Sequence, residues 1–417
     1  MFSDHAQDYT AVMVGDDQRI LRLVLLVNLL PLTLLVEILP LRVVIPRLRG
    51  HLLLNIVFYM SRYCIIHSLL YKMYYTFIAE KAYLINSCIH SRFLMSGSIE
   101  IRLMRQTDIP EANRIIRHAF VTFLGLPNSL SFMGDAGYVK TRYISNPSAA
   151  LVAEVNSKLA GSNFALNWGS VGIFGPLTIH PDLWNKGVAK RLLEKTMELF
   201  DRWKIKHAGL FTFAQSIKHI HLYQSFGFWP RFLTSIMSKT LGQTQGPEQP
   251  SYHWNRFSEL NSYEKKRAIE ECIDLTNQIY NGLSLETEIY SIEKQRLGDT
   301  ILLREDNKNN GTLNAIAICH CGPGTEAGGG TCYVKFGAVR PSQDSSTYFD
   351  HLLAVCELFA KSQQLSHVTA GVNLGRHNAY RKMIEHHFRT DLQGVAMHKP
   401  NEAGYNTEDT YVIDDWR

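Results

Sequence analysis

Residues 176–193 read Pro-Leu-Thr-Ile-His-Pro-Asp-Leu-Trp-Asn-Lys-Gly-Val-Ala-Lys-Arg-Leu-Leu, and this stretch decides the fold. A strand ends in it, a short loop turns, and a helix begins at Gly187. Because Gly187 and Ala189 have little or no side chain, a ligand can approach the backbone N–H groups that the first turn of a helix leaves unpaired. The helix dipole favours an anion at the same place. The stretch therefore predicts a strand–loop–helix site that suits a pyrophosphate.

Short strands and amphipathic helices alternate around this site, from Ile99 to residue 241. Helices are expected from Asp108, with Pro110 in the first turn, over Gly187–Trp203 and over Lys218–Phe226. The expected strands are Ile99–Met104, Ala150–Val155, Leu159–Leu166, Val171–Ile179 and Gly209–Phe213. The three middle strands would form an antiparallel meander. The fold class expected is α/β, with a mixed and mostly antiparallel sheet flanked by helices.

The C-terminal part of the chain repeats this order of elements. Its expected helices are Tyr263–Tyr280, Phe349–Lys361 and Arg376–His386, and its expected strands are Thr300–Arg304, Leu313–Cys319, Cys332–Val339 and His367–Val372. Single residues recur in the same order, pairing Leu192 with Leu352, Phe200 with Phe359, His207 with His367, Tyr223 with Tyr380, Phe228 with Phe388 and Met237 with Met397. A duplicated domain explains this agreement. We expect one domain over residues 95–241, a linker rich in Gln, Gly and Pro over 242–251, and a second domain over 252–417.

A second motif, Ser-Ile-Lys-His-Ile-His-Leu-Tyr-Gln-Ser-Phe-Gly-Phe, occupies residues 216–228. Together with the loop Trp-Asn-Lys-Gly-Val-Ala at 184–189, it resembles the GCN5-related N-acetyltransferase (GNAT) superfamily. The phosphate loop of that family is commonly Gln/Arg-x-x-Gly-x-Gly/Ala, and a later helix reads Asn-x-x-Ala-x-x-Leu-Tyr-x-x-x-Gly-Phe. Trp184 stands where the family has Gln or Arg, and Ser216 stands where it has Asn. The resemblance covers about Ile99–Leu241, and more faintly Tyr252–Pro400.

This resemblance implies two tandem GNAT-like domains, of which the first binds acetyl-CoA as a co-substrate. It implies that backbone N–H groups of the loop hold the diphosphate, and that a backbone N–H of the strand before it stabilises the oxyanion. It makes Tyr223 the catalytic general acid, because a phenol of pKa about 10 can protonate a thiolate whose conjugate acid has a pKa of about 8.5. The expected cofactor-binding residues are Leu177, Thr178, Ile179, Trp184, Asn185, Lys186, Gly187, Val188, Ala189, Lys190 and Ser216.

The second copy is expected to be degenerate. Its turn Val339–Phe349 contains no Gly, and Asp344 would place a carboxylate where a diphosphate should lie. Tyr380 and Asn373 survive at the expected spacing, which ancestry explains. We expect this copy to complete the acceptor site or to cover the sheet edge of the first copy.

The sequence does not identify a general base. Some members of the family that it resembles use Glu on the central strands, directly or through water, but Val171–Ile179 contains no carboxylate. Glu154, His180 and His207 are candidates, and each fits a solvated or packed side chain better.

Cysteine and glycine clusters in the second copy are interpreted as structural. Cys319-His320-Cys321 with Cys332 could suggest a metal site, but no second close Cys/His pair completes a tetrahedral set. Residues two apart in a strand share a face, so Cys319 and Cys321 would be buried together as small apolar side chains. We expect no metal. Gly328-Gly329-Gly330 is interpreted as a hairpin loop.

Residues 1–94 form a separate, more apolar unit with few turn residues. Leu23–Leu41 is about long enough to span a bilayer, and a second run covers His51–Ala79. Both contain polar or helix-breaking residues, among them Asn28, Pro31, Glu37, Pro40, Arg62, His67 and Lys72. Three interpretations stay open: a membrane-attached helical pair with membrane contact through residues 20–79, a soluble helical prefix, or a segment outside the functional protein. Met95 directly precedes a well-patterned strand and is a plausible true start.

Length and composition limit the class of protein, its binding partners and its location. A length of 417 residues predicts two or three domains. Hydrophobic residues at 46% and charged residues at 19% exclude a disordered chain, and a net charge of +5 is too small to indicate a nucleic-acid partner. Seven cysteines, mostly in hydrophobic runs, indicate reduced thiols and a cytoplasmic location, with membrane association through the N-terminal segment as the alternative.

We therefore expect an N-acetyltransferase that transfers acetyl from acetyl-CoA directly to an amine of a small-molecule or peptide acceptor. The expected assembly is a monomer or a homodimer. The alternative is a non-catalytic acyl-CoA-binding or regulatory protein, which the missing base and the departures at Trp184 and Ser216 leave open.

Overall fold

The computed structural model describes residues 98–128, 132–242, 252–305 and 311–417. The interpretations of residues 1–94 and nearly all of the expected linker lie outside these ranges. Residues 94–417 form one compact unit. None of the helices in the described ranges is long and apolar enough to cross a membrane. Below, residues 98–242 are called the first half and residues 252–417 the second half.

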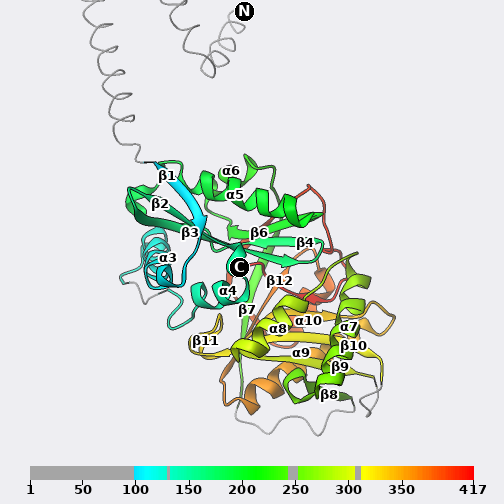
Figure 1. Cartoon of the computed structure of the whole chain (residues 1–417). Helices are drawn as coiled ribbons and strands as arrows, with labels where there is room; N and C mark the ends of the chain where they lie inside the picture. Colours follow the sequence, from blue (N-terminus) through cyan, green and yellow to red (C-terminus); the bar gives the residue numbers. More distant parts are fainter. Residues whose placement is uncertain (1–97, 129–131, 243–251, 306–310) are drawn as a thin grey trace, which may run out of the picture. The chain divides into compact units, whose positions relative to one another are not determined.

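One sheet of 14 strands runs through both halves (Figure 1). Its order is β1-β2-β3-β4-β6-β13-β7-β12-β11-β10-β9-β8, with β5 paired to β3 and β14 paired to β11. The pairs β4–β6 and β11–β12 are parallel, and the other pairs are antiparallel. The first-half strands are β1 Ile99–Leu103, β2 Ala150–Val155, β3 Lys158–Trp168, β4 Val171–Phe174, β5 Thr178–Ile179, β6 His207–Phe213 and β7 Trp229–Thr240. The second-half strands are β8 His253–Arg256, β9 Gly298–Arg304, β10 Leu313–Gly322, β11 Gly328–Val339, β12 His367–Asn373, β13 Arg389–Lys399 and β14 Val412–Ile413.

Helices cover both faces of the sheet. In the first half they are α3 Ile109–Leu124, α4 Val139–Ser145, α5 Val188–Trp203 and α6 Ile217–Gln224; in the second they are α7 Ser262–Ile279, α8 Glu286–Gln295, α9 Ser345–Ser362 and α10 His377–Glu385. Alternate residues of β2 pack on opposite sides, Leu151 in the cluster with α5 and α6, and Val152 in the cluster with α3 and α4. In the second half, Leu302 packs with α7 and α8, and Leu303 with α9 and α10.

The expected fold class is confirmed, and the structure corrects two local predictions. The strand expected over Val171–Ile179 is two strands, because Pro176 has no N–H to donate to a ladder. Gly328–Gly330 begin β11 and do not form its preceding loop. Gly329 donates its N–H to Asp135 Oδ1 at 2.7 Å, and a Cβ there would lie 2.9 Å from the other carboxylate oxygen. The loop before α4 therefore packs directly against the start of β11.

The two halves exchange one long strand each within the common sheet: β7 is the last strand of the first half, and β13 belongs to the second half. β7 pairs with β12 of the second half, β13 pairs with β6 of the first half, and the two strands pair with each other in between. The two halves share an order of elements, but β7 and β13 each pair with a strand of the other half. The domain limits expected from the sequence stay a prediction.

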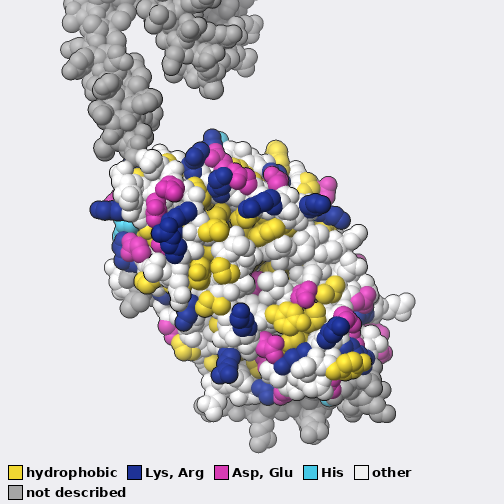
Figure 2. Space-filling model, viewed as in Figure 1, with side chains coloured by type: hydrophobic (Ala, Val, Ile, Leu, Met, Phe, Trp, Pro, Cys, Tyr) yellow, Lys and Arg dark blue, Asp and Glu magenta, His cyan; other side chains and the backbone are white. Residues whose placement is uncertain are grey.

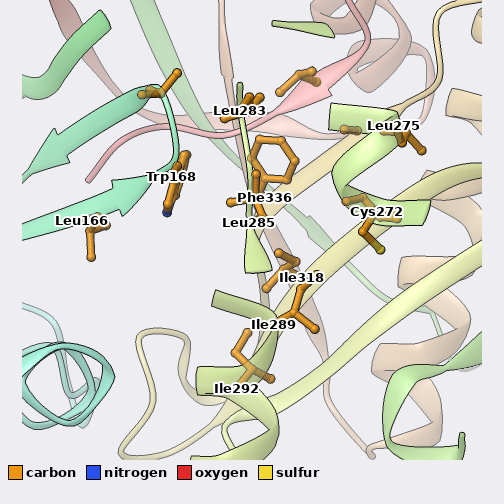
Figure 3. Packing of buried hydrophobic residues seen from close by; sticks show 14 of the residues in the cluster. Leu166, Trp168, Cys272, Leu275, Leu283, Leu285, Ile289, Ile292, Ile318 and Phe336 are labelled. Atoms are coloured by element: carbon orange, nitrogen blue, oxygen red, sulfur yellow. The ribbon is translucent and has the colours of Figure 1, made fainter. Parts of the chain in front are cut away.

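The two halves also share a hydrophobic core. Leu166 and Trp168 of β3 pack in one cluster with Phe336 of β11 and with Leu283 and Leu285, which precede α8 (Figure 3). The rings of Trp168 and Phe336 meet edge to face with centroids 5.6 Å apart, and both side chains are buried. Such aromatic pairs add about 0.5–1.5 kcal/mol to the effect of burial. We therefore expect the two halves to unfold together.

We expect Phe336→Ala to lower the free energy of unfolding by about 3–5 kcal/mol, because it removes a buried ring and leaves a cavity between the halves. Tyr263→Ala is the matched control, since Tyr263 is 79% exposed on α7, and it should change stability by less than about 0.5 kcal/mol. Urea denaturation followed by circular dichroism measures both. A single transition should be retained by the wild type, and two separate transitions would contradict the shared core.

Candidate active site

The strands β4 and β6 separate in the middle of the first half. They pair in parallel only from Val171 with His207 to Ile173 with Gly209. Beyond that point the chain from Phe174 turns away, and β5 pairs with β3 alone. β6 continues to Phe213, paired on its other edge with β13. We call the gap between residues 174–179 and 210–213 the first wedge.

A cavity of about 870 Å³ occupies the first wedge and extends beyond it. This volume lies within the range of small-molecule sites. Its walls come from the first wedge, residues 183–190, α3 and α6. The second half and the last residues of the chain add Glu326, Ala327, Thr369, Asp391, Leu392, Trp416 and Arg417. Both halves therefore build one site.

All the site residues predicted from the sequence line this cavity, except Lys186. Lys186 is exposed in the loop between Asn185 and Gly187, which both line it. The structure thus brings Tyr223 together with the loop and with residues 177–179, which come more than 30 residues earlier in the sequence. Their binding of a cofactor stays a prediction.

The loop before α5 presents free backbone N–H groups. Gly187 is the N-cap with φ +82°, a left-handed conformation that favours glycine. The first helical bond runs from the Arg191 N–H to the Gly187 carbonyl, so the N–H groups of residues 188–190 have no partner within the helix. A Cβ built on Gly187 would meet no atom within 4 Å. The space in front of the helix terminus is open to an anion.

Trp184 anchors this loop. Its indole Nε1 donates to the Ile179 carbonyl at 2.8 Å, which ties the loop to the end of β5. The Lys218 Nζ lies 5.8 Å from the centroid of the indole ring, within cation–π range. The residue that departs from the resembled pattern thus holds the loop by its own hydrogen bond.

Tyr223 points into the same cavity from α6. It is only 7% exposed, and its ring packs against Phe174 with centroids 5.8 Å apart. Burial raises the pKa of Tyr223 above its ordinary value, so the phenol keeps its proton. Nearby, the buried hydroxyl of Thr178 has no hydrogen-bond partner among the described residues. Both hydroxyls are able to bond to a ligand.

The three candidate bases named from the sequence do not line the cavity. Glu154 accepts hydrogen bonds from Arg102, and His207 is buried with its Nε2 3.0 Å from His398 Nδ1. His180 is the N-cap of the short turn after β5 and accepts from the Asp182 N–H. These contacts give each of the three side chains a structural role outside the cavity.

Sequence reasoning missed His219, which lines the cavity from α6. Its Nδ1 lies 2.8 Å from the Ser216 Oγ. Burial, and then the charge of Lys218, lower the pKa of His219 below its ordinary value. The available signal was that His219 replaces the Ala of the resembled pattern, three residues after Ser216 replaces the Asn.

Phenylalanine side chains of α3 and β6 form one wall of the cavity, which we call the aromatic end. The ring of Phe213 of β6 contacts two rings of α3. Its centroid lies 6.2 Å from that of Phe120 and 5.4 Å from that of Phe123. Asp391, at the start of β13, is exposed on the same cavity. On the face that Figure 2 shows, charged side chains of both signs are interspersed with hydrophobic ones.

In the second half, the gap between β11 and β12 is the equivalent of the first wedge, and residues 412–415 of the chain fill it. β11 and β12 pair in parallel up to Val334 and Ala370, and β14 then takes the same edge of β11 at Gly337 and Ala338. A Cβ on Gly371 would lie 2.2 Å from the side chain of Asp415. We call this gap the second wedge.

Buried polar contacts hold the filling segment in place. Arg376 is 1% exposed and donates to the Val412 carbonyl at 2.7 Å and to the Asp414 carboxylate at 2.6 Å. The Tyr405 hydroxyl donates to the other Asp414 oxygen at 2.5 Å. Asn373, the counterpart of Ser216, donates to Thr234 and accepts from the Gly375 N–H. The second wedge is therefore occupied by residues of the chain, and its polar groups are used structurally.

The cysteine cluster of β10 and β11 consists of free thiols. Cys319 and Cys332 are buried, and Cys321 lies directly opposite Cys332 in the ladder. Within the described ranges, no group of three or more His, Cys, Asp or Glu side chains is arranged to hold a metal ion.

Residues 125–228 match the model of the acetyltransferase (GNAT) family. The chain carries a GNAT acetyltransferase domain. It is accordingly an acyltransferase, and the matched residues contain the first wedge, the loop, α5 and α6.

Solved structures with TM-scores above 0.5 share the fold of this chain. A putative acetyltransferase from Pyrococcus horikoshii is 12% identical, with 76% of this chain and 95% of that chain covered and a TM-score of 0.53. The glucosamine N-acetyltransferase region of a fungal multi-domain GH3 β-N-acetylglucosaminidase is 14% identical, with 72% of this chain and 38% of that chain covered and a TM-score of 0.51. A GCN5-related N-acetyltransferase from Sphaerobacter thermophilus is 15% identical, with coverages of 72% and 95% and a TM-score of 0.49. No curated protein matches the sequence.

Proposed function

We propose that this protein is an N-acetyltransferase that transfers the acetyl group of acetyl-CoA directly to an amine. The observation that carries the proposal is a single cavity that holds the unpaired N–H groups of the loop, the first wedge and the protonated Tyr223. GNAT domains generally use acetyl-CoA as co-substrate, and the open space at Gly187 and the unpartnered Thr178 hydroxyl fit a ligand of this kind.

In this proposal the diphosphate is bound by the N–H groups of residues 188–190, where the helix dipole also favours an anion. The first turn of α5 contains no acidic residue that would oppose this charge, and Lys190 lines the cavity. The pantetheine arm then lies in the first wedge along Leu177–Ile179. A strand edge freed from pairing with β6 can offer its N–H groups to the arm and to the thioester carbonyl.

The chemistry is an aminolysis of the thioester. The amine nitrogen attacks the carbonyl carbon, and backbone N–H groups of the first wedge stabilise the oxyanion that forms. Tyr223 donates its phenolic proton to the sulfur as the carbon–sulfur bond breaks. Burial keeps this phenol protonated at neutral pH, which a proton donor requires.

The amine enters from the aromatic end of the cavity. Phe123 and Phe213 offer apolar surface to the body of the acceptor, and the Asp391 carboxylate attracts an ammonium group. Residues of the second half line this end, so the second half completes the acceptor site.

Release of CoA thiol from acetyl-CoA, measured with a thiol reagent, tests the function. The acceptor panel contains 2-phenylethylamine, spermidine, glucosamine and a peptide with a free N-terminus. Amine-dependent release with formation of the N-acetyl product supports the proposal. Tight binding of acetyl-CoA without turnover of any amine would instead favour a non-catalytic acyl-CoA-binding protein.

Gly187→Glu should abolish CoA binding, because a carboxylate would occupy the phosphate position at the helix terminus. Gly125→Glu is the matched control: Gly125 also has a positive φ and open space around its Cβ, but it does not line the cavity. Both variants carry a similar backbone strain of about 1–2 kcal/mol. Calorimetry should find CoA binding only in the control, and equal affinity in both variants would refute the loop as the phosphate site.

Tyr223→Phe should lower turnover by roughly 10²–10⁴-fold, because it removes the proton donor and keeps the packing of the ring. Its affinity for CoA should stay close to that of the wild type. Tyr380→Phe makes the same change at the counterpart position of α10 and should leave turnover unchanged. An unchanged rate in Tyr223→Phe would assign proton donation to water.

CoA should bind with a stoichiometry near one per chain, because residues 412–415 fill the second wedge. Asp344→Ala removes the carboxylate near the start of α9 and should not create a second site. Titration calorimetry of the intact protein measures the number of sites. Two equivalent sites would mean that the second wedge opens to the ligand.

A further inference from the structure

We infer that His219 is the general base that deprotonates the acceptor amine, and that Ser216 positions its imidazole. The inference rests on the proposed function, because it concerns the same cavity and the same transfer. It deepens that function by identifying the proton acceptor, which sequence reasoning left unassigned.

The two departures from the GNAT pattern in this helix are hydrogen-bonded to each other. Ser216 replaces Asn and His219 replaces Ala, and the Ser216 Oγ lies 2.8 Å from the His219 Nδ1. Ser216 is 6% exposed at the N-cap of α6, so its hydroxyl is held in place. In the tautomer that a base requires, the Nδ1–H donates to the Ser216 Oγ. This bond fixes the ring and leaves Nε2 unprotonated, so that Nε2 can accept a proton from a substrate.

His219 and Tyr223 lie one turn apart on one face of α6. Residues four apart on a helix have Cβ atoms about 5–6 Å from each other, and both of these side chains line the cavity. The His219 ring also contacts Phe123, with centroids 5.3 Å apart. Phe123 belongs to the aromatic end where the amine enters. The imidazole is therefore close to both the proton donor and the acceptor wall.

The charge state of His219 suits a base. Burial and Lys218 lower its pKa, so the ring is neutral at pH 7 and can accept a proton. The other titratable side chains on the cavity are Tyr138, which precedes α4, His221 and Tyr223 of α6, Lys190 of α5, and Glu326, Asp391 and Arg417 from the second half. Among the described residues, no carboxylate forms an ion pair with His219, and Glu326 is already paired with Arg142 and Lys335.

The proton balance closes with one base and one acid. The amine nitrogen forms the new carbon–nitrogen bond and gives one proton to His219 Nε2. The carbon–sulfur bond breaks, and the sulfur takes one proton from Tyr223. The products are the N-acetyl amide and CoA thiol, and the imidazolium and phenolate return to their starting states by net transfer of one proton through solvent.

The test uses His219→Gln, which keeps a hydrogen-bonding side chain toward Ser216 but cannot accept a proton at neutral pH. With the fastest amine of the panel, or with water as acceptor if no amine reacts, kcat should fall roughly 10²–10⁴-fold while the affinity for acetyl-CoA is unchanged. His377→Gln is the control, because His377 is exposed on α10 and does not line the cavity.

The pH profile separates a base from a structural side chain. Wild-type kcat/KM should decline as the pH falls through a value below 6.5, where the imidazole becomes protonated. This limb should be absent in His219→Gln. In His219→Ala, added free imidazole should restore part of the activity. Ser216→Ala should weaken activity less and shift the same limb, and Ser216→Thr should recover it.

The outcomes distinguish the two proposals. A wild-type protein that neither binds acetyl-CoA nor releases CoA overturns the proposed function itself. A wild-type enzyme that is active, with His219→Gln equally active or with an unchanged acid limb, overturns the assignment of His219 and leaves the function standing.

Discussion

The antiparallel pairing of β7 with β13 at the centre of the sheet is the constraint on which the rest of the structure depends. It joins Leu233 to Val395 in the ladder and places β13 beside β6. One edge of β6 is thereby paired with β13 of the second half. β6 therefore stays in the sheet where its other edge is no longer paired with β4. The first wedge exists because β6 beyond Gly209 is paired with a strand on one edge only. The same pairing brings Asp391 and Leu392 to the cavity.

A buried network of charges fixes the rim of this cavity. Arg142 of α4 donates to the Glu326 carboxylate at 2.9 Å and to the Gly175 carbonyl at the edge of the first wedge. Glu326 also pairs with Lys335, which pairs in turn with Glu288. Burial alone would raise the pKa of Glu326, but Arg142 and Lys335 hold it well below its ordinary value. A buried charge without its partner is costly, so this network specifies one relative placement of α4 and the second half.

The sequence pattern predicts those helices and strands that depend only on neighbouring residues. The strand Ala150–Val155 and the helix that begins beyond Gly187 follow from alternation, helical periodicity and glycine at a helix terminus, and the structure confirms them. The exchange of β7 and β13 could not be predicted, because strand periodicity does not specify which strand is the partner. The roles of Trp184 and His219 could not be predicted either. Trp184 bonds to the Ile179 carbonyl and His219 bonds to Ser216, and these contacts exist only in the folded loop and helix.

The asymmetry between the two halves follows from the path of the last residues. Residues 412–415 fill the second wedge, and Trp416 then packs against Gly209, the residue at which β4 and β6 part. The Trp416 indole donates to Tyr405 at 2.9 Å, and Tyr405 in turn holds Asp414. One segment thus blocks the second wedge and forms a wall of the first cavity. Restoring glycine to the turn Val339–Phe349 would therefore not restore a second site. Clearing the wedge would require displacement of the same residues that shape the site in the first half.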